Sequence, residues 1–235
     1  MNFDQKVKQN EQPPLDCLED LMAHVTTAIR IINLGLSIYI IYLCFPVPED
    51  GLSLTTWHVL LYTIGWTFLM VEGIFFVPKE NICTSRLSQP TRVLIHWLVL
   101  VVATGFIIAG FTVIVVQAAD RGSDHFSTNH GLPGAVATIL AYVCCINGIP
   151  AVFAGKLRKI IKPNINKLFH ALVGIAAVLS GAVATVTGFY TGWFRNRSTP
   201  TMQNVCYVVL VIITCWLLLK PVINSLVRIK SFCSS

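Results

Sequence analysis

Hydrophobic and polar positions alternate along this chain in long blocks rather than at the short periods of a water-soluble fold. The apolar blocks are about 17–25 residues long, which is the length an α-helix needs to cross the hydrocarbon core of a bilayer. There are six of them, at residues 25–46, 57–77, 93–117, 131–153, 168–190 and 204–226. The polar stretches between them are short. The pattern therefore predicts an all-α fold, an integral membrane bundle of six transmembrane helices.

The polar ends of the chain complete this organisation. We expect one six-helix membrane domain at residues 24–226, an N-terminal tail at residues 1–23 and a C-terminal tail at residues 227–235. The N-terminal tail contains Pro13 and Pro14, and it lacks the basic start and short apolar core of a cleaved signal peptide. The first apolar block is therefore predicted to serve as the insertion signal.

Composition supports the membrane assignment, and the distribution of charge adds an orientation. Only 12% of the residues are charged and 54% are hydrophobic, whereas a soluble domain carries about 25% charged residues. If both termini are cytosolic, the cytosolic segments hold 14 of the 17 lysines and arginines and the opposite side holds 3. This is the positive-inside bias of membrane proteins. The net charge of +6 is thus an orientation signal, and we predict no nucleic-acid partner.

Four histidines lie at the starts of consecutive apolar blocks: His58, His96, His130 and His170. Because successive spans run in opposite directions, the starts of the second and fourth spans share one membrane face, and the starts of the third and fifth share the other. The sequence therefore predicts two pairs, His58 with His130 and His96 with His170. A single interfacial histidine is more often an anchor than a ligand. Four at matching depths point to the bundle interior, where intramembrane ionisable residues usually face.

Small residues follow two of these histidines along their own helix faces. The stripe after His130 is Gly134, Ala137, Ala141, Cys144 and Gly148, and the stripe after His170 is Gly174, Ala177, Gly181, Ala184 and Gly188. Such stripes allow membrane helices to pack closely, but a flat macrocycle held by the histidine also needs a bare helix face. Imidazole is a common axial ligand of haem iron. We therefore predict two b-type haems with two histidines each, an arrangement that favours electron transfer over oxygen binding.

Four stretches resemble the cytochrome b561 family of six-span, di-haem transmembrane reductases: "WHVLLYTIGWTFLMVEG", "VLIHWLVLVVATGF", "NHGLPGAVATIL" and "LFHALVGIAA". The resemblance covers roughly residues 20–226. It implies that His58 and His130 bind the luminal-side haem iron, and that His96 and His170 bind the cytosolic-side haem iron. It also implies electron transfer from cytosolic ascorbate to monodehydroascorbate radical or ferric iron, an endoplasmic reticulum or cytoplasmic vesicle membrane, and a homodimer.

Substrate binding has three candidate residues. Ascorbate is a monoanion at neutral pH, so a donor site requires cations near the cytosolic haem. Arg92 and Lys167 each precede a cytosolic-side histidine by about one helical turn, although positive-inside orientation explains them equally well. In the luminal loop, His125 is a candidate for acceptor binding or proton release, or else a solvated loop residue.

Glu72 is a carboxylate inside the second span, where an unpaired charge is costly. We expect it either to bond the free N–H of a ligand imidazole or to reach the interface as a helix-end carboxylate.

Two other functions stay open. One is a haem-bearing membrane anchor of a quinone-linked complex, and the other is a metal-ion or proton transporter that uses the histidines as a relay. The small-residue stripes oppose the transporter, because a transported ion needs polar walls and discontinuous helices.

Overall fold

The computed structural model describes residues 13–45, 48–49, 51–79, 81–152 and 162–234, and every regular element within those ranges is a helix. The long elements are α2 (Pro13–Tyr42), the run of α3 (Leu54–Tyr62), η1 (Thr63–Met70) and α4 (Val71–Phe75), then α5 (Gln89–Asp120), α6 (Gly131–Val152), α8 (Pro163–Phe189) and α10 (Pro200–Cys233). A short helix, α9 (Gly192–Arg195), precedes α10. Six of these helical runs are long and apolar enough to cross a membrane. The predicted all-α bundle of six spans is confirmed.

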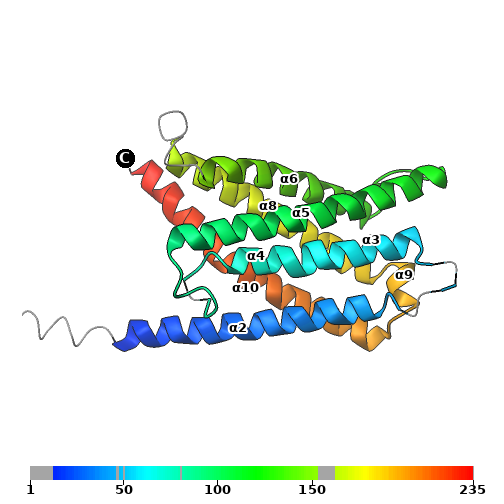
Figure 1. Cartoon of the computed structure of the whole chain (residues 1–235), viewed down its shortest axis with the longest axis horizontal. Coiled ribbons are helices and arrows are strands. Elements are labelled where there is room, and N and C mark those ends of the chain that lie inside the picture. The colour runs from blue at the N-terminus through cyan, green and yellow to red at the C-terminus, as the bar shows by residue number, and fades with distance from the viewer. Residues whose placement is uncertain (1–12, 46–47, 50, 80, 153–161, 235) are drawn as a thin grey trace, which may run out of the picture.

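The long helices lie side by side along one axis (Figure 1). We name the end of the bundle where α2 begins and α10 finishes the terminal end, and the other end the opposite end. The helices α5 and α8 begin at the terminal end, and α3 and α6 begin at the opposite end. Each predicted histidine pair therefore belongs to one end of the bundle.

Several helices extend beyond the apolar blocks, because capping residues rather than hydropathy set where they begin. Ser53, Ser88 and Thr199 each accept a hydrogen bond from the backbone N–H three residues later, at 3.2, 3.3 and 3.3 Å. At the other end of the chain, α10 continues to Cys233, so most of the expected C-terminal tail is helical. Residues 1–12 of the expected N-terminal tail lie outside the described residues. So do Lys156, Arg158 and Lys159, which are three of the 14 lysines and arginines assigned to the cytosolic side.

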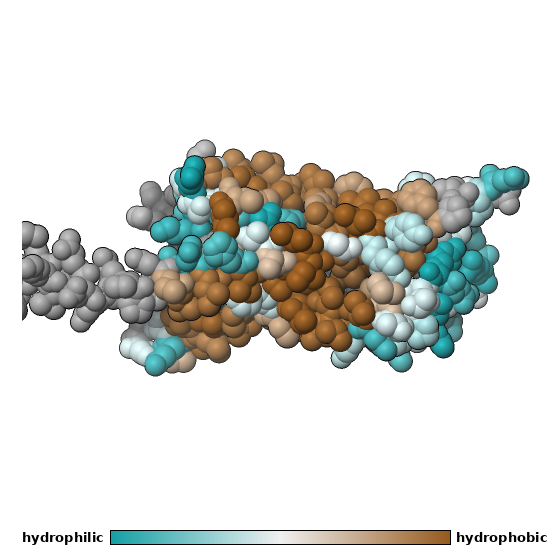
Figure 2. All heavy atoms as spheres, turned by 90° about the horizontal axis from the view of Figure 1, so that it is seen from below, coloured by the Kyte–Doolittle hydropathy of each residue, from teal (hydrophilic) through white to brown (hydrophobic). Residues whose placement is uncertain are grey.

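Apolar side chains cover the middle of the molecule, and polar side chains gather toward its two ends (Figure 2). Ile31, Val102 and Leu226 are 66%, 53% and 61% exposed. Exposed apolar surface on this scale is suited to lipid rather than to water. The protein is an integral, multi-pass membrane protein.

The second span changes its helical geometry halfway along. η1 is a π-helix between two α-helical segments, and such segments are rare and frequently lie at functional sites. Asn33 of α2, which is fully buried, donates a hydrogen bond to the carbonyl oxygen of Thr67 at 2.9 Å. The side chain of α2 thereby satisfies a carbonyl of the widened turn. Nothing in the hydrophobic pattern predicted this segment.

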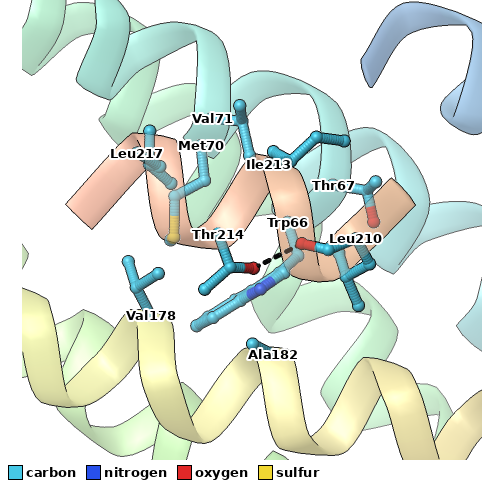
Figure 3. Close-up of a pocket in the computed structure, with 10 residues that line it drawn as sticks. All are labelled: Trp66, Thr67, Met70, Val71, Val178, Ala182, Leu210, Ile213, Thr214 and Leu217. Carbon is cyan, nitrogen blue, oxygen red and sulfur yellow. Dashed lines mark hydrogen bonds between the residues drawn. The ribbon is translucent and has the colours of Figure 1, made fainter. Parts of the chain in front are cut away.

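Trp66 projects from η1 into the centre of the bundle. Figure 3 shows its indole pointing across a small apolar cavity toward Val178 and Ala182 of α8, beside α10. A Cβ atom on Gly181 would overlap the indole ring. The glycine is therefore needed for this close approach, which locks the second span against α8.

Candidate functional site

Two pairs of histidines lie inside the bundle, one toward each end. At the opposite end, the ring centroids of His58 and His130 are 6.0 Å apart with their planes at 86°. At the terminal end, those of His96 and His170 are 6.3 Å apart with their planes at 76°. The structure thus brings together the same residues that the alternation of the spans paired. Each pair joins the α3–α5 half of the bundle to the α6–α8 half.

The separations suit axial ligation of a single metal ion. Two imidazoles bound on opposite sides of one iron, through bonds of about 2 Å, have ring centroids about 6–6.5 Å apart. In the part of the chain that the structure describes, no group of three or more His, Cys, Asp or Glu side chains is placed to hold a metal ion. A macrocycle is one source of the further ligands that a metal bound by two histidines needs.

Backbone carbonyls help to orient the imidazoles. Nδ1 contacts are made by His58 with Gly110 O (3.1 Å), by His96 with Gly73 O (2.8 Å) and by His130 with Ala184 O (2.8 Å). A carbonyl oxygen can only accept, so each Nδ1 carries the proton and each Nε2 keeps its lone pair. Metal-ligating histidines are usually held in this way, with the second nitrogen donating to a carbonyl or carboxylate.

The fourth imidazole, that of His170, has a thiol as its neighbour. Cys144 Sγ lies 3.5 Å from Nδ1, 3.9 Å from Nε2 and 3.5 Å from the carbonyl oxygen of His170. Cys144 thus packs its side chain on this ring, and its backbone is also a hydrogen-bond partner of the His170 imidazole.

Glycines near the ends of α6 and α8 make room for the histidine on the partner helix. A Cβ atom on Gly188 of α8 would lie 3.2 Å from Cε1 of His130, and one on Gly148 of α6 would lie 3.5 Å from Cε1 of His170. The two antiparallel helices therefore repeat one arrangement, with a histidine near the start of each and a glycine opposite it.

Two further glycines of the small-residue stripes, Gly134 and Gly174, face the partner helix. A Cβ atom on Gly134 would lie 3.8 Å from the Cβ of Ala184, and one on Gly174 would lie 3.4 Å from Cys144 Sγ. The interpretation of the stripes as a bare wall for a macrocycle stays a prediction. The two glycines pack α6 closely against α8, as small residues do in membrane helices.

A buried polar atom beside His170 provides a test of whether the site fits a cofactor. Trp97 Nε1 is buried and has no hydrogen-bond partner among the described residues. The Cβ position of Gly148 lies 3.5 Å from His170 Cε1 and 3.9 Å from Trp97 Cδ1, so the indole belongs to this site. An unpaired buried polar group costs about 1–3 kcal/mol. A polar group of a bound molecule would satisfy it, and the residues present therefore fit a haem.

The candidate substrate residues differ in what they contact. Arg92 donates from Nε to Val77 O at 3.1 Å and from Nη1 to Leu87 O at 2.7 Å. It thereby ties down the loop between α4 and α5. Lys167 is exposed on α8, about one turn before His170. His125 is exposed in the loop before α6, with its ring 5.8 Å from that of Phe126.

Glu72 forms an ion pair with Arg30 of α2. The carboxylate oxygen Oε2 accepts from Arg30 Nη2 at 2.5 Å and from Nε at 2.9 Å. The predicted bond between Glu72 and a ligand imidazole is wrong, because the neighbouring carbonyl of Gly73 accepts from His96 instead. Sequence reasoning missed Arg30, although it is the one Lys or Arg of the first span, Cys17–Tyr42. The first span contains the cation of Arg30, and the second contains the carboxylate of Glu72. This opposite pair of intramembrane charges could have predicted the ion pair.

A six-helix membrane bundle with two interior histidine pairs belongs to the class of membrane proteins that hold cofactors between helices. Residues 57–195 match the family model of eukaryotic cytochrome b561, and the chain belongs to this family. Its cofactor is accordingly haem b.

Curated relatives carry the name transmembrane reductase CYB561D2. The proteins from Mus musculus and Homo sapiens are each 27% identical to this chain over 172 residues, which is 73% of this chain and 75% of theirs. The protein from Bos taurus is 28% identical over 200 residues, which is 85% of this chain and 83% of its own. No solved structure matches the chain significantly.

Proposed function

We propose that the protein is a di-haem transmembrane reductase that takes electrons from ascorbate in the cytosol and delivers them to monodehydroascorbate radical or ferric iron in the lumen. The observation that carries the proposal is the two histidine pairs, with ring centroids 6.0 and 6.3 Å apart, toward opposite ends of one bundle. Membership in the cytochrome b561 family and the reductase names of the relatives support it.

The four histidines would fill both axial positions at each iron. The haem, when bound, supplies a one-electron carrier whose redox chemistry is its own. If His58 and His130 held one iron, and His96 and His170 the other, oxygen would have no protein-side position to bind, and the backbone carbonyls would keep the rings in place. The protein's contribution is therefore to hold two carriers at fixed positions and to keep other reactants away from them.

Part of the interior of the bundle is apolar, which favours electron transfer over ion transport. Met70, Ile107 and Ala141 form a buried cluster there, with Trp66 packed against it. A path for protons or metal ions needs polar groups or water, because a charge is expensive in an apolar medium. The histidine-relay alternative therefore has no support from these residues.

The terminal end would be the cytosolic side, with both chain termini in the cytosol, because the positive-inside bias favours that orientation. Lys167 is then the better of the two cations for ascorbate, since it is exposed whereas Arg92 already donates to two loop carbonyls. His125 would face the lumen and the acceptor. An endomembrane location and a homodimer follow from the family resemblance.

The test is purification in detergent, followed by haem quantification and spectroscopy. We expect two low-spin b haems per chain that ascorbate reduces. In liposomes containing a ferric chelate, external ascorbate should generate ferrous iron inside, and liposomes with haem-free protein should not. A well-folded sample without haem would overturn the proposal. A haem-loaded protein that ascorbate fails to reduce would remove ascorbate as donor. A large quinone-linked partner that copurifies would favour the membrane-anchor alternative.

A further inference from the structure

A network of polar side chains surrounds the Arg30–Glu72 pair at the terminal end. Besides Glu72, Arg30 donates from Nη1 to Asn81 Oδ1 at 3.0 Å and lies within 3.4 Å of Cys83 Sγ. Asn81 is 1% exposed, accepts from the backbone N–H of Cys83 at 2.9 Å and donates to the carbonyl of Phe75 at 2.9 Å. The network therefore joins α2, the end of α4 and the loop that follows it.

This network ends one residue from the carbonyl that holds an axial-ligand candidate. Glu72 and Gly73 are consecutive residues of α4, and Gly73 O accepts from His96 Nδ1 at 2.8 Å. The Phe75 carbonyl, held by Asn81, belongs to the same turn. A movement of α4 would therefore move the carbonyl that orients His96.

Net stabilisation is a weak reason for keeping such a pair. The side chains of Arg30 and Glu72 are only 18% and 11% exposed, and removing two charges from water costs about as much as their attraction returns. Ionisable groups in membrane spans are retained mainly where they serve a function. An ion pair beside a redox centre can serve in two ways. It fixes the position of the backbone that carries it, and it adds no net charge near the centre.

We propose that Arg30 and Glu72 act as a positioning pair that holds the Gly73 carbonyl on His96, and that Glu72 cancels the charge of Arg30 and so keeps the reduction potential of the terminal-end haem from rising. The inference rests on the proposed haem ligation. Neither residue touches the imidazole. Glu72 acts through the backbone of Gly73 and through its charge, which cancels that of Arg30.

Redox titration of Glu72→Gln against the unmodified protein tests the charge component. The variant leaves the arginine cation uncompensated, because a guanidinium stays protonated. A nearby cation favours the reduced haem, so the terminal-end haem should become up to about tenfold easier to reduce, or about 59 mV for a one-electron couple. The double variant Arg30→Gln/Glu72→Gln restores neutrality and should return the potential to within about twofold of the original.

Electron paramagnetic resonance of the oxidised haems tests the positioning component. Both Glu72→Gln and the double variant should shift the low-spin signal of the terminal-end haem and leave the other haem unchanged. Lys230→Gln removes an exposed cation at the same end of the bundle and should change neither readout. Haem quantification keeps this test separate from that of the proposed function, because a haem-free unmodified protein would refute the latter.

Three results would overturn the inference. The first is an unchanged potential in Glu72→Gln, the second is an equal shift at both haems, and the third is a double variant that shifts as far as the single one. If Glu72→Gln does not retain haem, Glu72→Asp and the double variant provide the test, since Glu72→Asp keeps the ion pair and the double variant removes it. The low-spin signal of the terminal-end haem should shift in the double variant and stay unchanged in Glu72→Asp, and the same signal in both would count against the proposal.

Discussion

The two ends of the bundle hold similar histidine pairs in different surroundings. At the terminal end, an ion pair lies one residue from the carbonyl bound to His96, and the thiol of Cys144 packs on His170. At the opposite end, the contacts of His58 and His130 within the described residues are with uncharged groups. The ring of Tyr62 lies 4.7 Å from that of His58, and its hydroxyl is 2.7 Å from that of Thr138.

The difference shows how one fold can make two equivalent ligand sets inequivalent. The ring separations of 6.0 and 6.3 Å are nearly equal, so ligand geometry alone gives electrons no preferred direction. Charges and dipoles around the ligands tune a metal centre, and here they are arranged unequally. The asymmetry is therefore the feature that experiments should perturb.

The largest effect is expected from removing one ligand at a time. His170→Ala should abolish haem binding at the terminal end and preserve it at the opposite end, and His58→Ala should do the reverse. Each variant should keep one haem per chain and lose electron transfer across liposomes. Haem quantification and the residual low-spin signal measure this, with His24→Ala as a control because His24 is exposed and in neither pair. Loss of both haems in each variant would mean that the two sites are not independent.

Gly181→Val should weaken haem binding at both ends of the bundle. The valine would displace Trp66, which packs between the second span and α8. The new side chain would overlap the Trp66 indole, which forces the second span away from α8. Overpacking of this kind costs about 1–3 kcal/mol or more. We expect both haems to be released at a clearly lower temperature, as followed by the Soret absorbance. Gly105→Val is the matched control, since no atom lies within 4 Å of its Cβ position. Selective loss of one haem would contradict this prediction.

Hydropathy and the alternation of spans predicted the six helices and both histidine pairs, because lipid imposes length and direction on each helix. Helix starts were less predictable, since caps such as Ser88 act outside the apolar blocks. The packing of the stripes could not be predicted, because a sequence shows that Gly174 is small but not that Cys144 of α6 faces it. The Arg30–Glu72 pair was missed because its partners are 42 residues apart and belong to different helices.

A smaller and more selective effect is expected from the two glycines that face the histidines. In Gly188→Ala, the methyl group would lie 3.2 Å from His130 Cε1, closer than an ordinary contact, and should push the ring away from the Ala184 carbonyl. In Gly148→Ala, the corresponding distance to His170 is 3.5 Å, which is an ordinary van der Waals contact. We expect Gly188→Ala to shift the low-spin signal of the opposite-end haem, and Gly148→Ala to shift neither signal. A shifted terminal-end signal in Gly148→Ala with no shift in Gly188→Ala would contradict this prediction. It would show that His170 has less free space around its ring than His130.

The smallest effect is expected from Tyr62→Phe. Thr138 already donates its hydroxyl proton to Gly134 O at 2.8 Å, so the Tyr62 hydroxyl donates to Thr138 Oγ1 at 2.7 Å. Removing this bond should cost about 0.5–1.5 kcal/mol, seen as a lower temperature of haem release at the opposite end only. The ring that packs on His58 remains, so the haem content should not change. Tyr142→Phe is the matched control, because Tyr142 packs against the same buried cluster. An equal decrease in the temperature of haem release at both ends would contradict this prediction. It would show that the Tyr62 hydroxyl stabilises the whole bundle, because a hydrogen bond that acts only near His58 should not affect the histidine pair at the terminal end.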